Sequence, residues 1–166
     1  MSKVEIFTIK QDVFLYIDDY LWMWDTLEEQ REQSQIARQA HGDVLVAGYG
    51  LGILQQFLIA NPAVTGVYTF EICLDVMEAA KAHYGKIHGH VSIRDFYVPP
   101  ENPTMKYDCV VGDIWQDITP RCLPDYKRFK EVALQWLKPG GKILAWGKET
   151  FEVFLEREAC GTLHTG

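Results

Sequence analysis

The sequence lacks the features that mark several large protein classes. Its four cysteines, Cys73, Cys109, Cys122 and Cys160, show no CxxC spacing. That pattern argues against a zinc site and a disulfide framework, and it is typical of a reducing cytoplasm. No apolar run is long enough to span a membrane, and the first residues do not resemble a secretory signal. We therefore expect a cytoplasmic protein with no membrane partner and no bound metal.

A basic surface is also missing. The formal net charge is −7, whereas nucleic-acid binding draws most of its affinity from Lys and Arg side chains on phosphates. One short basic cluster, Lys127, Arg128 and Lys130, falls on a predicted helix and is more typical of a solvated face. We expect no nucleic-acid partner, and the acidic balance favours neutral or cationic small molecules as ligands.

Strand and helix patterns alternate along most of the chain. With 166 residues, 48% of them hydrophobic, the chain can form one well-packed core. Buried-strand patterns at 44–47, 67–70, 90–93, 107–111 and 143–146 alternate with helical patterns at 51–60, 73–84, 125–137 and 149–159. Such alternation predicts a mainly parallel sheet with right-handed crossovers. We predict a single α/β domain over 1–166, a Rossmann-like three-layer sandwich with about five strands.

Two connections interrupt this alternation. The segment 95–106 contains Pro99, Pro100 and Pro103, so the crossover between the third and fourth strands should have little or no helix. Residues 139–141, Pro-Gly-Gly, predict a turn before the last strand. Only one helix follows that strand, so we expect the sheet to stop at five strands. The exposed edge would then be covered by the N-terminal segment or by another subunit of a homo-oligomer.

The first 24 residues follow a different pattern. The segment from Val4 to Trp24 is rich in aromatic and β-branched residues and predicts a β-hairpin that turns near Gln11. Asp25, with Glu28 three positions later, resembles a helix cap, and a polar helix should run to about residue 40. The ligand-binding core is expected at 42–148.

A glycine loop is the strongest functional signal. Gly48, Tyr49, Gly50, Leu51 and Gly52 follow a strand pattern and open a helix, which is the context that a nucleotide-binding fingerprint requires. Its glycines allow a tight turn, close approach of the backbone to a ligand, and helix packing on the strand. The helix N-terminus adds free N–H groups. The alternative is a tight turn that binds nothing.

Two acidic residues follow the next two strands. Glu71 lies nineteen positions after Gly52, where an acidic side chain accepts hydrogen bonds from ribose hydroxyls. It could instead cap the helix that follows. Asp95 follows the third strand and could accept from an adenine amine or serve only as a turn residue. We interpret Glu71 as a nucleoside ligand and leave both possibilities open for Asp95.

The loop after the fourth strand contains the candidate catalytic group. Asp113 could take a proton from an amine or orient it, Asp117 could attract it, and Trp115 could stack on a cation or pack in the core. Gly112 would let the backbone approach the site. Asp18 and Asp19, if they converge with Asp113, would suit a cationic amine. The nearby His83, His88 and His90 suggest a metal site only weakly, because no suitable acidic residue accompanies them.

Together these motifs resemble class I S-adenosylmethionine-dependent methyltransferases over about 42–148. The resemblance rests on the glycine loop, Glu71, Asp95, the strand leading to Asp113, and the 137–141 segment. Within that superfamily the chain is most similar to spermidine synthase-like proteins, because 13–19 resembles their N-terminal hairpin and Asp113 matches their catalytic aspartate. The resemblance implies that the donor is S-adenosylmethionine or its decarboxylated form, with Gly48, Tyr49, Gly50, Gly52, Glu71 and Asp95 binding the donor. It implies that Asp113 is catalytic and that Asp18, Trp115 and Asp117 contact a small acceptor such as a cationic amine.

The chain also departs from the family pattern. Ala47 replaces the acidic residue that in methyltransferases helps to hold the amino-acid end of the donor. Asp113 and Asp117 are one residue further apart than the aspartate pair of spermidine synthases, and Gln30 and Arg31 replace a tyrosine–histidine pair. Three hypotheses follow: methyl transfer to a small molecule, which the sequence favours, aminopropyl transfer to a polyamine, and a non-catalytic binding or assembly module.

Overall fold

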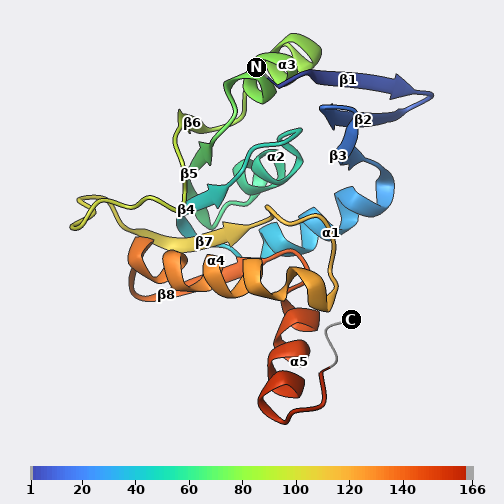
Figure 1. The fold of residues 1–166 in the computed structure, drawn as a ribbon. Coiled ribbons are helices and arrows are strands. Elements are labelled where there is room, and N and C mark those ends of the chain that lie inside the picture. The colour runs from blue at the N-terminus through green and yellow to red at the C-terminus, as the bar shows by residue number, and fades with distance from the viewer. Residues whose placement is uncertain (1, 164–166) are drawn as a thin grey trace.

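The computed structural model describes residues 2–163 and has a five-stranded parallel sheet in the order β6-β5-β4-β7-β8 (Figure 1). The prediction of a Rossmann-like α/β fold is confirmed. The strands of this sheet are β4 (Gly42–Ala47), β5 (Val64–Glu71), β6 (His90–Ile93), β7 (Tyr107–Gly112) and β8 (Leu137–Ala145). The helices are α1 (Leu27–Arg38), α2 (Ile53–Ala60), α3 (Leu74–Tyr84), α4 (Leu123–Trp136) and α5 (Lys148–Ala159), with a short 3-10 turn at Pro120–Cys122.

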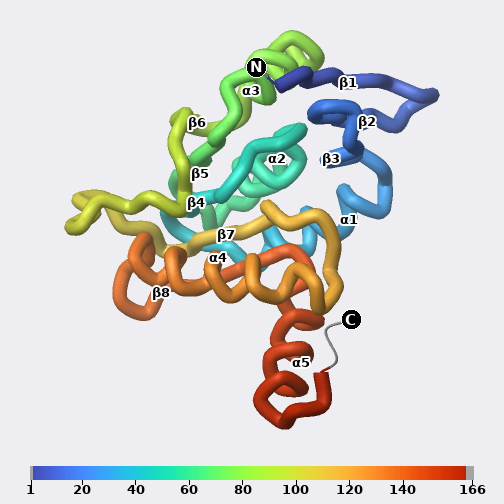
Figure 2. Tube along the Cα trace, viewed as in Figure 1, coloured from blue at the N-terminus to red at the C-terminus, as the bar shows by residue number. Residues whose placement is uncertain are grey.

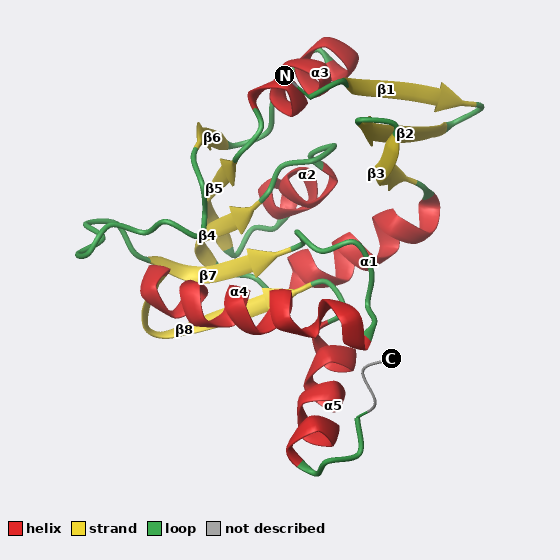
Figure 3. Cartoon of the chain, in the orientation of Figure 1, coloured by secondary structure: helices red, strands yellow, loops and turns green. Residues whose placement is uncertain are grey.

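Helices cover both faces of this sheet, which gives the three layers seen in Figure 3. Successive residues of a strand face opposite sides. In β4, Val44 and Val46 pack with α1 and α2, whereas Leu45 and Ala47 belong to the core under α4. Burial on both faces explains why residues 44–47 of this strand are apolar throughout. α5 extends away from the sheet (Figure 2) and is anchored by the buried Phe151. No helix among residues 2–163 is both long and apolar enough to cross a bilayer.

The N-terminal segment forms three strands rather than the predicted hairpin. β1 (Val4–Ile9), β2 (Asp12–Ile17) and β3 (Tyr20–Asp25) make a separate antiparallel sheet in sequence order. Asp18 and Asp19 form the second turn, with φ of 50° and 66°. A two-residue hairpin turn that matches the twist of its strands needs positive φ, which aspartate tolerates better than most residues. The sequence interpretation missed the turn because it read the two carboxylates as ligands.

This small sheet packs on the core rather than extending the parallel sheet. Val13 and Leu15 of β2 are buried against Leu51, Ile53 and Val76. The predicted covering of a sheet edge by the N-terminal segment is therefore wrong for the described residues, because the three strands form their own sheet. They lie beside α3 (Figure 1) and on the side of the glycine loop. A homo-oligomer remains a prediction.

The cap of α1 lies one residue later than predicted. The side chain of Thr26, not Asp25, accepts from the backbone N–H of Glu29 at 3.3 Å. A threonine followed three residues later by glutamate is a capping-box sequence. Asp25 instead accepts from the Gln30 side chain at 2.6 Å.

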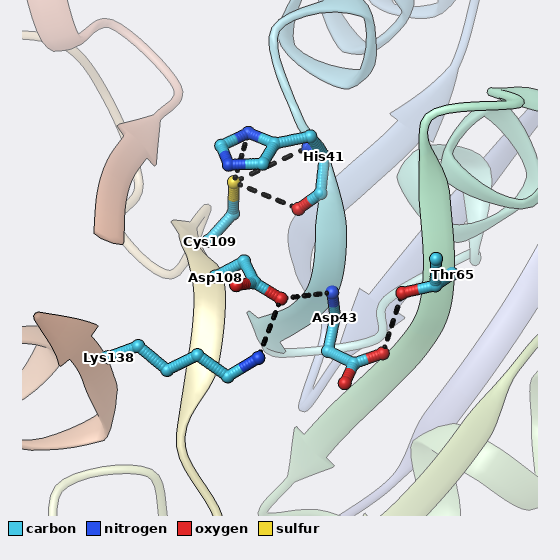
Figure 4. A network of polar contacts seen from close by, with 6 residues as sticks. All are labelled: His41, Asp43, Thr65, Asp108, Cys109 and Lys138. Carbon is cyan, nitrogen blue, oxygen red and sulfur yellow. Dashed lines mark hydrogen bonds and ion pairs between the residues drawn. The ribbon is translucent and has the colours of Figure 1, made fainter. Parts of the chain in front are cut away.

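The amino ends of the strands are joined by a polar network (Figure 4). Asp108 accepts from the backbone N–H of Asp43 at 2.8 Å and from Lys138 at 2.9 Å, and Asp43 accepts from Thr65 at 2.9 Å. These bonds tie the starts of four neighbouring strands at the end opposite the glycine loop. This end therefore serves structure, and the carboxyl ends are left for ligands.

The strand order reverses beside the glycine loop. The chain runs outward from β4 to β5 and β6, then crosses back to β7 on the other side of β4. As predicted, the 94–106 crossover contains no helix. The predicted turn at 139–141 is instead an irregular part of β8, because β7 pairs with Leu137 and then with Lys142. In open parallel sheets a reversal of this kind is where ligands bind.

Gly112 packs against the core and not toward a ligand, which corrects the sequence interpretation. A Cβ atom at Gly112 would lie 2.6 Å from the ring of Phe129 on α4. Overpacking of this kind costs about 1–3 kcal/mol. We expect Gly112→Ala to lower the free energy of unfolding by that amount, as measured by urea denaturation. A Cβ atom at Gly140 would meet open space, so the comparison variant Gly140→Ala should add only the backbone strain of a positive φ. A Gly112→Ala variant as stable as the wild type would contradict this packing.

Candidate functional site

A cavity of about 290 Å³ lies at the carboxyl ends of the parallel strands. Its volume is close to the lower end of the range for small-molecule sites. The glycine loop forms its floor, and the loops after β5, β6, β7 and β8 form its walls. The N-terminal sheet and the first turn of α1 close one side through Ile17, Trp22, Met23, Trp24 and Glu29.

Glu71 and the glycine loop face each other at the base of this cavity. One carboxylate oxygen of Glu71 accepts from the backbone N–H of Tyr49 at 2.8 Å, and the other accepts from the N–H of Cys73 at 2.8 Å. Glu71 therefore also supports the turn into α3, as the alternative interpretation held. Each carboxylate oxygen can accept more than one hydrogen bond. The side chain is thus fixed in place and can still accept hydrogen bonds from the hydroxyl groups of a ligand in the cavity.

Met23 covers part of the glycine loop, which the sequence did not reveal. Its sulfur accepts from the N–H of Leu51 at 3.3 Å and would collide with a Cβ atom at Gly50. One amide of the predicted ligand-binding loop is therefore paired with a side chain of β3. Below the loop, the Tyr49 ring lies where a Cβ atom at Gly52 would be. The three glycines of the loop have positive φ, which explains why glycine is needed there.

Asp95 lies at the cavity wall after β6. Its carboxylate accepts from the N–H of Tyr97 at 2.8 Å, so it forms a local turn as well as part of the wall. Its neighbour Arg94 stacks over the rings of Phe70 and Trp136, at 5.2 and 5.0 Å from their centroids. Among the described residues that line the cavity, Arg94 is the one cationic side chain. Both interpretations of Asp95 are compatible with this placement.

Asp113 belongs to a three-residue network that the sequence did not predict. The side-chain nitrogen of Gln33 donates to Asp113 and to Glu29, each at 2.6 Å. Gln33 is fully buried, and Glu29 and Asp113 line the cavity. Burial raises the pKa of Asp113 to about 6 and that of Glu29 to about 7. Two carboxyl groups that change charge near neutral pH are typical of sites that exchange protons.

A spacing in α1 could have revealed this network. Glu29, Gln33, Ile36, Ala37 and Ala40 recur at three- and four-residue intervals on one helix face. The apolar members pack on the sheet, so the polar members of the same face also point inward. The sequence interpretation described this helix only as polar and did not name the residues of its one packed face.

We expect Glu29→Gln to raise stability at pH 8. Because the folded-state pKa of Glu29 is about 7 instead of 4.5, stability is lost as the pH rises through this interval. The loss is up to about 3 kcal/mol, since each pKa unit corresponds to about 1.4 kcal/mol. Urea denaturation at pH 5 and pH 8 should show a smaller pH dependence for the variant. Glu28→Gln, an exposed change in the same turn, serves as the control. Equal pH dependence in Glu29→Gln and the wild type would contradict the assignment.

The other predicted substrate residues lie elsewhere. Asp18 accepts from the backbone N–H of Lys3, and its turn does not line the cavity. Asp117 is paired with Arg121 and Thr119 outside the cavity. Trp115 packs edge-on against Tyr126, Phe129 and Phe151, as the packing interpretation held, and also reaches the cavity wall. No three His, Cys, Asp or Glu within 2–163 are grouped to hold a metal ion.

The polar groups of the cavity fit a cationic ligand. Glu29, Glu71, Asp95 and Asp113 place four carboxyl groups in its walls against one arginine. The side-chain oxygen of Gln55, which also lines the cavity, is buried and has no hydrogen-bond partner among the described residues. Because this oxygen has almost no accessible surface, a ligand in the cavity would not contact it directly. A sulfonium nucleoside carries the matching charge.

Comparison with solved structures identifies the fold. A spermidine synthase from Thermotoga maritima is similar with a TM-score of 0.62 and 16% identity, over 96% of this chain and 60% of that one. A spermidine synthase in complex with the transition-state analogue AdoDATO gives 0.63 and 15% over the same shares. An S-adenosylmethionine-dependent methyltransferase from Clostridium acetobutylicum gives 0.51 and 15%, over 70% of this chain and 49% of that one. The chain has a class I methyltransferase-like fold.

These likenesses are structural and do not extend to sequence families. No protein-family model matches the chain, and no curated protein matches it. The chain spans between 49% and 60% of the length of these structures. The match to the spermidine synthases covers 96% of the chain and thus includes most of the N-terminal sheet, whereas the methyltransferase match covers 70% of the chain.

Proposed function

We propose that this chain binds a sulfonium nucleoside and transfers an alkyl group from its sulfur to a small amine. The observation that carries the proposal is the placement of Glu71 and Asp113 on either side of the glycine loop, in the wall of one cavity. Glu71 would hold the ribose, and Asp95 the base. Asp113 would lie beside the reacting groups. The similarity of the fold to methyltransferases and spermidine synthases supports the same reaction class.

The chemical step needs alignment and one proton acceptor. The lone pair of the amine forms a bond to a carbon attached to the sulfonium, and the carbon–sulfur bond breaks. Its electron pair stays on sulfur, which becomes a neutral thioether. An amine that binds as an ammonium must first give one proton to Asp113, because only then does its nitrogen carry the lone pair that attacks. Because the pKa of Asp113 is about 6, its carboxylate predominates at neutral pH and can act as the base.

The charges in the cavity favour a donor without a carboxylate. Ala47 supplies no polar group where methyltransferases often have one. The one cation of the lining, Arg94, stacks on Phe70 and Trp136 at the β6 side. A methionyl carboxylate would meet like charges in a cavity whose walls hold four carboxyl groups. We therefore favour decarboxylated S-adenosylmethionine and aminopropyl transfer, in contrast to the sequence, which favoured methyl transfer.

Thermal-shift titration tests the donor. We expect decarboxylated S-adenosylmethionine to raise the melting temperature, with an affinity at least about tenfold above that of S-adenosylmethionine, which corresponds to about 1.4 kcal/mol. S-adenosylhomocysteine serves as the carboxylate-bearing comparison without the sulfonium. Tighter binding of S-adenosylmethionine would support methyl transfer instead. No shift with any of the three ligands would contradict the proposed function and support a non-catalytic module.

A further inference from the structure

The order of the strands separates two ends of the cavity. Asp95, Glu71 and the glycine loop follow β6, β5 and β4, which occupy one half of the sheet. The loops after β7 and β8 lie on the other half, together with the first turn of α1, which Gln33 connects to Asp113. β3 leads into α1, and its Met23 also contacts the glycine loop. We call the part around the loops after β7 and β8 the acceptor end, because the proposed nucleoside ligands Glu71 and Asp95 lie at the other end. Neighbouring strands are about 4.8 Å apart, so Glu71 after β5 and Asp113 after β7 are two strand spacings, about 10 Å, apart.

The acceptor end has one focus of negative charge. Its two carboxyl groups, Glu29 and Asp113, both accept from the same nitrogen of Gln33 at 2.6 Å. They therefore lie side by side and cannot hold two separated ammonium groups. The other nearby carboxylates are engaged elsewhere: Glu32 accepts from the indole of Trp146 at 2.7 Å, and Asp117 pairs with Arg121.

Apart from Gln116, the rest of the acceptor end is apolar and aromatic. Ile17, Trp22 and Trp24 form its wall on the side of the N-terminal sheet, and Ile114 and Trp146 face them from the loops after β7 and β8. The bond to Glu32 fixes the ring of Trp146. Trp22 lines the cavity and is 47% exposed, so its ring is accessible to a ligand there. Aromatic faces attract both alkyl chains and ammonium groups.

From this arrangement we infer that the acceptor is a monoamine with an apolar body rather than a polyamine. Its single amine would lie beside Glu29 and Asp113, and its hydrocarbon part would lie against Trp22, Trp24 and Trp146. A second ammonium at the far end of a diamine would have to leave water for an apolar wall, which is costly without a partner. This inference rests on the proposed function and narrows its acceptor.

A matched pair of amines tests the inference. Hexylamine and 1,6-diaminohexane have the same chain length and differ in one terminal amine. The donor in both reactions is S-adenosylmethionine or its decarboxylated form, depending on which of the two stabilises the protein more. The product of each reaction is measured by mass spectrometry. We expect kcat/KM for hexylamine to exceed that for the diamine at least tenfold. If a donor binds and the diamine reacts equally well or better, the monoamine inference is overturned while the proposed function stands. If no donor binds, both are overturned.

Two variants of β3 test the aromatic wall. Trp22→Glu adds a second centre of negative charge at the acceptor end, apart from the Glu29–Asp113 pair, and we expect it to shift the ratio of kcat/KM values at least tenfold toward the diamine. Tyr20→Glu adds the same charge on the same strand, at a residue that is 73% exposed and outside the cavity lining. The control should leave the ratio unchanged. Melting curves of both variants establish that they fold. An unchanged ratio in a folded Trp22→Glu protein would overturn the contact between this wall and the acceptor.

Discussion

Glu71→Gln should weaken binding of the donor nucleoside about 100-fold. Both oxygens of Glu71 accept from backbone N–H groups, at Tyr49 and Cys73. A glutamine has one acceptor oxygen, so its NH₂ group would face one of these N–H donors and turn the side chain away. Loss of two charge-assisted hydrogen bonds to ribose costs about 3 kcal/mol, which corresponds to about two orders of magnitude in affinity. Isothermal titration with the stabilising donor measures the effect.

The control for this variant is Glu78→Gln on α3. It makes the same chemical change at an exposed position and should bind the donor as the wild type does. Glu71→Gln also removes a support of the turn into α3, so its melting temperature must be recorded together with its affinity. A folded Glu71→Gln protein that binds the donor with unchanged affinity would place the nucleoside elsewhere and would refute the central contact of the site.

The fold could be predicted because its signals are local. Val44–Ala47 is apolar throughout, the glycine loop follows it directly, and Glu71 ends the next strand. Each of these features depends on residues close in sequence, and their alternation allows few topologies. The three prolines of the 94–106 crossover likewise predicted that it contains little or no helix. The carboxyl ends of the strands then had to meet at one side of the sheet.

The missed part of the site depends on contacts between distant segments. Gln33 reaches Asp113 across 80 residues of sequence, and Met23 reaches the glycine loop from a different sheet. Residue type alone pointed to Asp18 and Asp117 instead, because both are carboxylates near predicted site residues. Asp18 has the backbone geometry of a turn, and Asp117 pairs with Arg121. Local chemistry identifies such groups, but only packing decides which of them face the cavity.

Asp113→Asn should lower turnover by about two to four orders of magnitude, the usual contribution of a general base. Asparagine keeps an oxygen that can accept from Gln33, so the donor affinity should stay close to that of the wild type. The melting temperature at neutral pH should not fall, because the variant removes a buried charge whose burial raises its pKa. The wild-type rate should fall as the pH drops through the range in which the Asp113–Glu29 pair gains protons, because burial raises the pKa of these groups to about 6 and about 7. The two groups share Gln33, so the fall reports the pair and not one residue.

The matched control is Asp117→Asn, since Asp117 pairs with Arg121 and Thr119 and does not line the cavity. Its turnover should change less than about threefold, the scale of a surface ion pair. Turnover by both variants, measured with the amine that reacts fastest and with saturating donor, distinguishes the roles. Comparable losses at the two positions would mean that the charge of this loop matters and not the proton taken by Asp113. Full activity in Asp113→Asn would show that the amine loses its proton to another acceptor, for which Glu29, on the same glutamine, is the nearest group.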